Sequence, residues 1–437
     1  MTTTQKRQVI PIIAMIFLFG MISFVTNLAS PMGDILKFQF KVDNWMGTLG
    51  VFANFIAYAV MGYPAGNLLQ KLGYKKTALI AIAVGFVGVG IQTLSGTMES
   101  FGIYLLGAFV AGFSMCLLNT VVNPMLNKLG GGGNKGNQLI QVGGSFNSLC
   151  GTAVIILTGV LIPEGIKNAQ ISNVFPLMYA ALAIFAFAFI VIAFTSIPEK
   201  NKEEQAASAR SSQYSALSFR HFILGAIGIF VYVGVEVGVP NVLNKWLQNP
   251  DLDVLKLGNS GTAEAIAGSV AATYWFLMLI GRLLGAAIGS KVSAKSMLGV
   301  ASVVGLVLTV AAIFASTDCR VNLPVFKNDA SGLFGLADVP VSAALLVLVG
   351  LCTSVMWGGI FNLAVEGLGK YTEKASGIFM VLVCGGGILP LLQNGIVDFA
   401  GGVGYSVSYW VIVAGLLYLL YYALIGSKNV NKDIPVH

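Results

Sequence analysis

The most regular feature of the sequence is a series of apolar stretches separated by short polar breaks. A helix needs about 20 mostly apolar residues to cross a bilayer, so each stretch predicts one transmembrane helix. The sequence therefore predicts an all-α integral membrane protein. The twelve predicted spans are 10–33, 47–70, 77–97, 102–127, 139–162, 174–197, 221–247, 264–289, 297–316, 339–364, 375–396 and 404–426.

A strongly polar stretch at 198–220 follows the sixth span and divides the chain into an N-terminal half, 1–197, and a C-terminal half, 221–437. Weak repeats support two pseudo-symmetric halves of six helices. The segment NPMLNKLG ends the fourth span of the first half, and NLAVEGLG ends the fourth span of the second. GNLLQKLG and GRLLGAAIG similarly occupy the inner ends of the two second helices. Twelve helices in two related halves are typical of secondary transporters, which bind substrate between the halves.

Composition supports a location in lipid, because only 10% of the 437 residues are charged and 56% are hydrophobic, whereas about a quarter are charged in soluble domains. With the N-terminus inside, eighteen of the 25 lysines and arginines fall on the cytoplasmic side. This bias predicts that both termini are cytoplasmic. The net charge of +7 then reflects basic residues beside anionic lipid and requires no nucleic-acid partner. The first apolar stretch lacks a cleavage site and is kept as a span.

One acid, Glu236, lies near the middle of a predicted span. An ionisable group at that depth indicates a function by default, because its burial is costly. Pro240 removes the donor for the Glu236 carbonyl, and Pro31 does the same for Asn27. Free carbonyls beside a carboxylate and an amide can coordinate a cation, so Glu236, Asn27 and Ser30 are the predicted coupling residues. The alternatives are a structural carboxyl and a mechanical kink.

Amides and aromatic rings inside the spans predict a site for a neutral polyol, and we find no mid-span arginine or lysine that would favour an anion. Ser23, Asn27 and Ser30 share one helical face. Asn147 shares a face with several glycines, which suits either a ligand or another helix. The predicted substrate-binding residues are Asn27, Asn119, Asn123, Gln141, Asn147, Tyr232, Asn241, Trp357 and Asn362.

Basic residues at the inner ends of equivalent helices predict a cytoplasmic gate. Lys71, Lys75 and Lys76 follow the second span, and Arg282 lies near the end of the eighth. Such cations can bond helix C-terminal carbonyls and the acids of neighbouring loops when the inside is closed.

The sequence does not favour an enzyme. His221 and His437 are its two histidines, and no spacing suggests a metal or catalytic site, so no metal and no cofactor are expected. A channel is disfavoured by the two-half repeat, since distinct asparagines in each half suggest one alternating site. An exporter of other small solutes stays open, although it would favour a large apolar cavity.

The most distinctive motifs of the chain are YPAGNLLQKLGYKK, LLNTVVNPMLNKLG with GGSFNSLCG, YVGVEVG, IGRLLG and CGGGILP. These motifs resemble the fucose–galactose–glucose–proton symporter branch of the major facilitator superfamily. The resemblance covers all twelve spans and implies a monomeric sugar carrier of a bacterial inner membrane. Gln70 stands where the gate motif of the superfamily usually has an acid. It implies uptake of a hexose such as glucose, galactose or mannose by alternating access.

The resemblance also bears on coupling and on which sugar is carried. Relatives place two acids at the positions of Ser30 and Asn119, so both acids used for proton coupling are missing here. Fucose is therefore disfavoured as the substrate, while Phe146-Asn147-Ser148 is retained. The acid gained is Glu236, which leaves sodium symport, proton symport and uncoupled facilitation as the alternatives.

Overall fold

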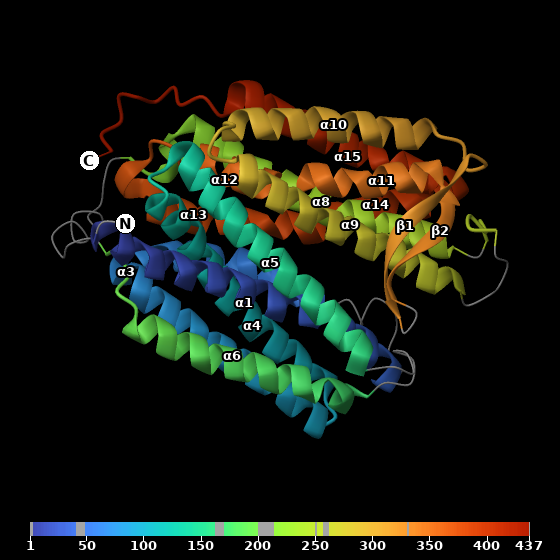
Figure 1. The fold of residues 1–437 in the computed structure, drawn as a ribbon, viewed down its shortest axis with the longest axis horizontal. Coiled ribbons are helices and arrows are strands. Elements are labelled where there is room, and N and C mark those ends of the chain that lie inside the picture. Colours follow the sequence, from blue (N-terminus) through green and yellow to red (C-terminus); the bar gives the residue numbers. More distant parts are fainter. Residues whose placement is uncertain are drawn as a thin grey trace. The chain divides into compact units, whose positions relative to one another are not determined.

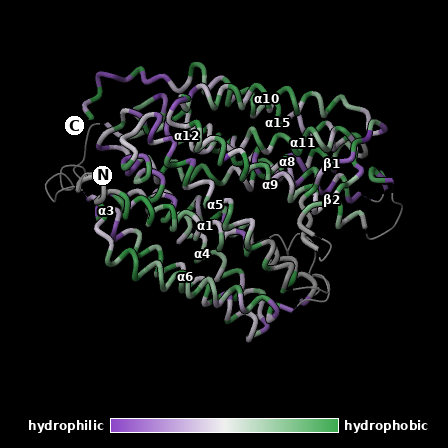
Figure 2. The backbone as a smooth tube through the Cα atoms, viewed as in Figure 1, coloured by the Kyte–Doolittle hydropathy of each residue, from purple (hydrophilic) through white to green (hydrophobic). Residues whose placement is uncertain are grey.

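Long helices dominate the computed structural model, which describes residues 3–40, 49–161, 170–199, 214–249, 251–256, 262–329 and 332–436 (Figure 1). Figure 2 shows that the helices are hydrophobic along most of their length. Their bounds are α1 Thr3–Phe40, α3 Leu49–Thr97, α4 Phe101–Leu129, α5 Gly133–Leu161, α6 Phe175–Phe194, α8 Arg220–Gln248, α9 Thr262–Ile288, α10 Ala294–Phe314, α11 Val341–Thr353, α12 Met356–Val365, α13 Thr372–Val381, α14 Gly385–Ala400 and α15 Gly404–Tyr421.

The predicted spans coincide with these helices. Within the described residues, ten stretches are long and apolar enough to cross a membrane. One of them, Phe52–Thr97, contains two predicted spans, and α5 covers the predicted span that the ten leave out. The all-α membrane fold predicted from the sequence is confirmed. The predicted linker lies largely outside the described residues, which resume at 214.

Two predicted spans run together in α3, which bends at Gly73. That residue has φ 80° and ψ 176°, a conformation outside the helical region that glycine adopts readily. The break leaves the next amides without partners in their own helix. Glu199 accepts hydrogen bonds from the backbone N–H groups of Tyr74, at 3.0 Å, and Lys75, at 2.6 Å. A carboxylate therefore caps the helix that restarts after Gly73.

Two other spans are discontinuous, which the apolar pattern did not predict. The tenth is divided into α11 and α12 at Ser354 and Val355, where the Ser354 hydroxyl donates to the Leu351 carbonyl. The eleventh is divided into α13 and α14 by a short turn over Leu382–Cys384. Both breaks leave backbone groups available at membrane depth, where they must find partners in the protein or in a wet cavity.

A β-hairpin also departs from the prediction, which left its residues in an outer loop. β1, Arg320–Asp329, pairs antiparallel with β2, Gly332–Pro340. The Arg320 guanidinium anchors the hairpin, because it donates to Asp338 at 2.7 Å and to the Val254 carbonyl at 3.0 Å.

The chain packs as two compact units, each with contributions from separate parts of the sequence. Unit 1 comprises Met1–Ile223, Val365–Cys384 and Asn429–His437. Unit 2 comprises Leu224–Ala364 and Gly385–Lys428. The units thus depart from a simple division at 198–220, because a segment of the second half packs in unit 1. The division into halves at the linker itself stays a proposal.

In unit 1, α13 packs against α3 with almost no side chain between the two backbones. A Cβ atom added at Gly377 would collide with the backbone of Gly66 and would come within 2.5 Å of the Gly62 carbonyl oxygen. On the same helix, the Ser376 hydroxyl donates to the Thr120 carbonyl of α4 at 3.0 Å. Glycine at these positions is therefore what allows the helices to approach so closely.

Candidate functional site

An ion pair lies inside the helices of unit 2. The Arg282 guanidinium of α9 donates from Nη2 to Oε1 of Glu236 on α8 at 3.3 Å. Each of the two side chains is 13% exposed. At such burial, loss of one partner would leave an uncompensated charge, which typically costs 3–5 kcal/mol. The acid predicted for cation coupling therefore has a resident counter-ion.

Arg282, which was predicted as part of the cytoplasmic gate, lies in the second half of α9, six residues before its end at Ile288. Its Nε atom donates to the Ser354 carbonyl at 3.4 Å, at the break between α11 and α12. The gate role of Arg282 stays a prediction, and its ion pair with Glu236 is a contact that the sequence did not indicate. Arginine has a long stem that can reach outward or inward, and here the partner lies inside.

Aromatic side chains surround this pair. Tyr232 lies one turn before Glu236 on α8, and its buried ring meets Trp357 edge to face with centroids 6.3 Å apart. The buried Tyr232 hydroxyl interacts with the Glu236 carboxylate one turn along the same helix. The Tyr274 hydroxyl and the Thr353 hydroxyl are 3.0 Å apart beside the α11 break. The structure thus brings two predicted site residues, Tyr232 and Trp357, into one cluster with the ion pair.

The remaining predicted residues of unit 2 are not part of the Glu236–Arg282 ion pair. Pro240 is inside α8, so the Glu236 carbonyl lacks its helical donor. Asn241 follows it and accepts from Asn394 of α14 at 3.2 Å, and Lys245 donates to the same Asn394 at 2.9 Å. Asn362 is buried in α12 at 3% exposure.

Gln393 of α14 is a polar residue that sequence analysis missed. It is fully buried, and neither amide atom has a hydrogen-bond partner among the residues that the structure describes. Its Oε1 lies so close to Gly238 of α8 that a Cβ atom there would collide with it. The sequence did contain a signal for it, because Gln393 is a polar residue inside the predicted span 375–396.

We expect Gln393→Leu to stabilise the protein, because an unsatisfied buried amide costs about 1–3 kcal/mol and leucine has a similar size. A thermal-unfolding measurement on the purified protein in detergent should show a higher Tm. Gln393→Ala is the control, since it removes the amide but leaves a cavity and should lower the Tm. An unchanged or lower Tm for the leucine variant would show that the amide is satisfied by a bound molecule such as water.

The predicted amides of α4 form a ladder in unit 1. Asn119 donates to the Tyr58 hydroxyl at 2.7 Å, and Asn123 donates to the Asn119 carbonyl at 2.9 Å. Both amides are buried, Asn119 at 5% exposure and Asn123 fully. The i, i+4 spacing seen in the sequence thus places the two side chains on one face, and Tyr58 of α3 is the partner that the sequence did not identify.

The amides of α1 and α5 meet where these helices cross. Asn147 donates to the Phe19 carbonyl at 2.7 Å, and Asn27 donates to the Ser23 hydroxyl at 2.9 Å. The glycine-rich face of α5 is covered by α1, because a Cβ atom at Gly151 would come within 2.8 Å of the Asn27 amide nitrogen. Helix packing, one of the two predicted roles, is therefore observed.

Two further predicted residues belong to unit 1. Gln141 of α5 is 2% exposed. The side chain of Ser30 lies outside the described residues, so its part in a coupling site stays a prediction. Binding roles for all these amides likewise remain predictions.

The three predicted gate lysines cluster around the bend at Gly73. Lys71 and Lys76 are exposed, and Lys75 is half-buried beside the Glu199 cap. Nearby, the Lys128 ammonium lies 5.8 Å from the centre of the Tyr74 ring, and the Lys374 ammonium lies 5.7 Å from that of Tyr63. The end of unit 1 around Gly73 is therefore rich in basic side chains, and Lys374 lies at the contact between α3 and α13.

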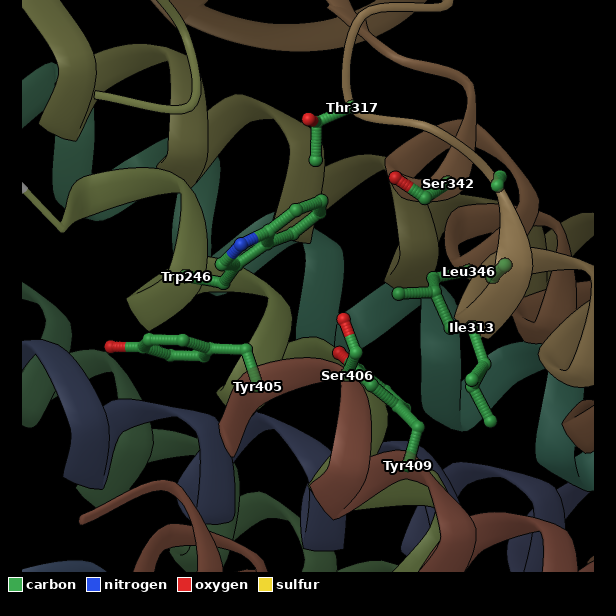
Figure 3. Close-up of a pocket in the computed structure, with 10 residues that line it drawn as sticks. Trp246, Ile313, Thr317, Ser342, Leu346, Tyr405, Ser406 and Tyr409 are labelled. Atoms are coloured by element: carbon green, nitrogen blue, oxygen red, sulfur yellow. The ribbon is translucent and has the colours of Figure 1, made fainter. Parts of the chain in front are cut away.

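A small cavity in unit 2 is lined by neither Glu236 nor Arg282. Figure 3 shows the side chains that line it. Its volume of about 20 Å³ is enough for roughly one water molecule, so a hexose does not fit there. Ser342 lines the cavity, and its buried hydroxyl has no partner in the described part of the structure, which suits a single water. The other lining residues are Trp246, Ala312, Ile313, Ala315, Thr317, Leu346, Tyr405, Ser406 and Tyr409.

Long apolar helices with an internal ion pair and buried amides are typical of multi-pass membrane transporters. Over the described residues, no group of three metal-ligating side chains is present. The chain belongs to the Major Facilitator Superfamily, whose model matches residues 12–391. Because proteins of this superfamily are transporters, the chain is a transporter and not an enzyme.

Similar proteins narrow the branch of the superfamily. A glucose/galactose transporter of Brucella abortus is 28% identical over 433 residues, which cover 98% of this chain and 97% of that protein. The L-fucose-proton symporter of Escherichia coli is 22% identical over 91% of this chain and 89% of its own length. The crystal structure of FucP in the outward conformation matches 97% of this chain and all of its own with a TM-score of 0.75 at 20% identity. The resemblance to the fucose–galactose–glucose–proton branch is confirmed.

Proposed function

We propose that the protein takes up a neutral hexose by cation-coupled symport with alternating access. The observation that carries this proposal is the match, over nearly the whole chain, to a protein named glucose/galactose transporter. The interior of the helices suits such a substrate, because amides and hydroxyls donate to and accept from sugar hydroxyls while aromatic rings cover apolar sugar faces. Candidate groups include Asn147 in unit 1 and Tyr232 and Trp357 in unit 2.

Glucose, galactose and mannose fit the proposal better than fucose. The fucose-proton relatives resemble this chain at lower identity, and the acids expected from that resemblance are replaced by Ser30 and Asn119. In the structure Asn119 is a neutral amide held by the Tyr58 hydroxyl. It therefore cannot take over the proton-carrying role of an acid.

We propose Glu236 as the coupling residue, with a proton as the coupling ion. The Arg282 guanidinium bears on the choice between ions, because it already neutralises the carboxylate at 3.3 Å. A sodium ion on Glu236 would lie near this positive charge, and like charges 4 Å apart repel by about 4 kcal/mol at an effective dielectric constant of 20. A proton adds the same charge, but it is carried on the carboxyl group itself and needs no space for an ion between Glu236 and Arg282. It also releases Arg282 from its partner. Sodium coupling through Glu236, Asn27 and Ser30 is the alternative.

The proposed cycle uses the gate end of unit 1. Lys71, Lys75 and Lys76 mark this end as cytoplasmic under the positive-inside rule, with both termini on that side. The α3–α13 contact at Gly377 then closes the cytoplasmic side and must separate when sugar leaves. We place the protein in the inner membrane of a bacterium, as a monomer surrounded by lipid.

A ligand screen on the purified protein tests the proposed substrate class. Thermal unfolding should shift upward with one or more of glucose, galactose and mannose, because a ligand that binds only the folded state stabilises it. Fucose and a sugar phosphate serve as comparison ligands and should shift it less. Saturable counterflow of the same hexose in proteoliposomes would separate a carrier from a channel. A shift with apolar drugs and none with hexoses would instead favour the exporter.

Asn147→Ala should weaken hexose affinity by about fivefold to 150-fold, since a hydrogen bond left unmade to a buried polar group costs about 1–3 kcal/mol. Asn27→Ala and Asn119→Ala should act in the same direction. Equilibrium binding of labelled hexose to the purified variants measures the effect. Thr152→Ala is the matched control on α5, because its hydroxyl donates to the Ser148 carbonyl one turn earlier and to no other group among the described residues. Unchanged affinity in all three asparagine variants would show that these amides serve helix packing alone.

A further inference from the structure

The C-terminal tail, Asn429–Val436, contacts two separate pieces of unit 1. The Asn431 side-chain oxygen accepts from the backbone N–H of Arg220, the first residue of α8, at 3.0 Å. The Val436 carbonyl accepts from the backbone N–H of Lys370 at 3.1 Å. Between them, Ile434 is only 7% exposed. The tail is thus held by two hydrogen bonds and one buried apolar side chain.

The loop that receives the tail is shaped for it by glycine. Gly367 and Gly369 have φ angles of 74° and 50°, which side chains rarely allow. A Cβ atom at Gly369 would collide with the Val436 carbonyl, and one at Gly367 would come within 3.0 Å of the Asn429 amide nitrogen. Glycine therefore serves both the turn and the close approach of the tail.

This receiving loop leads directly into α13. Gly369–Tyr371 forms a short helical turn, and α13 begins at Thr372. The far side of the loop is also fixed, because the His221 ring and the Glu366 carbonyl are 2.9 Å apart. Farther along, α13 contacts α3 through Gly377 and α4 through Ser376. The segment 365–384 is consequently held by the tail at its start and by α3 and α4 in its middle.

We propose that the C-terminal tail is a strap that positions the segment 365–384 against helices α3 and α4 of unit 1. The strap acts through α13, so it favours the packed α3–α13 contact over the separated one. This inference rests on the proposed function only in treating that separation as a step of transport. The contacts themselves are independent of which sugar or ion is carried.

The experiment measures how readily the α13 contact opens. Ser376 is fully buried. A Ser376→Cys protein, in which the exposed Cys319 and the half-buried Cys150 and Cys384 are replaced by serine, therefore reports opening through its rate of reaction with N-ethylmaleimide. Ile434→Ser removes the apolar anchor of the strap and should speed labelling about tenfold, the factor to which 1.4 kcal/mol corresponds. Deletion of residues 432–437 should have at least the same effect.

Asp433→Ser is the matched control, because it makes the same new residue at the neighbouring, exposed position. It should label at the rate of the unmodified tail. Equal rates for Ile434→Ser and Asp433→Ser, with both proteins monodisperse, would overturn the strap. Should the deletion variant fail to fold, the point variants still decide. A faster rate in a protein that transports no hexose would support the strap and refute the proposed function, so the two failures are distinguishable.

Discussion

The Glu236→Gln protein is expected to exchange hexose across the membrane but not to concentrate it. Glutamine nearly keeps the shape of the side chain and leaves Arg282 without its negative partner, as protonation of Glu236 would. The variant therefore resembles a carrier that is permanently loaded with a proton. Sugar can still bind and cross, but no proton is released to drive net uptake, since coupling of two ligands is reciprocal.

Two assays on the same proteoliposomes measure this separation. Counterflow of labelled hexose should persist in Glu236→Gln, while accumulation under an inward proton gradient should be lost. Glu236→Gln with Arg282→Gln is the folding control, because removing both charges avoids the unpaired buried charge. Accumulation that survives in Glu236→Gln would make this carboxylate structural, a partner for Arg282 and nothing more.

The Gly377→Ala protein should lose more than about 90% of its uptake, because overpacking a tight contact costs 1–3 kcal/mol and shifts the backbone. The new Cβ atom meets the backbone of Gly66, which cannot rotate away as a side chain could. The closed arrangement of α3 and α13 is therefore the state that the substitution disfavours. Initial rates of hexose uptake in cells, normalised to the amount of protein in the membrane, measure the loss.

Gly90→Ala provides the control for that experiment. Gly90 lies on the same helix α3, and a Cβ atom there meets nothing within 4 Å. Normal uptake is expected for this variant, and alanine should even favour the helix slightly. Normal uptake in Gly377→Ala as well would show that the backbone contact is loose and that the transport cycle does not depend on it.

Hydropathy predicted the membrane helices because every span must bury its backbone polar groups in a helix. The same pattern could not predict where a span is interrupted. The break at Ser354 depends on a hydroxyl bonding its own helix and on Arg282 reaching the freed carbonyl. The bend at Gly73 similarly depends on Glu199, which is distant in sequence. Such interruptions rest on partners from other helices, which a one-dimensional pattern does not contain.

In the candidate site, too, the residue types could be recognised from the sequence but the contacts between them could not. Glu236 could be singled out because an acid in the middle of a span is rare. Arg282 could not be paired with it from sequence, because its position near a span end fitted a gate as well. Gln393 was overlooked among apolar neighbours, yet the structure leaves its buried amide without a partner in the described residues. Side-chain partners, more than residue types, decided these assignments.

Gradient-driven uptake by the unmodified protein tests the central claim most directly. Proteoliposomes are given an inward proton gradient of one pH unit, an inward sodium gradient, or neither, and labelled hexose inside is measured at steady state. One pH unit is worth about 1.4 kcal/mol, so proton symport with one proton per sugar predicts accumulation up to about tenfold under the proton gradient alone. Accumulation only with sodium would contradict the proton assignment at Glu236. Equal hexose concentrations on both sides under every gradient would contradict cation-coupled symport itself.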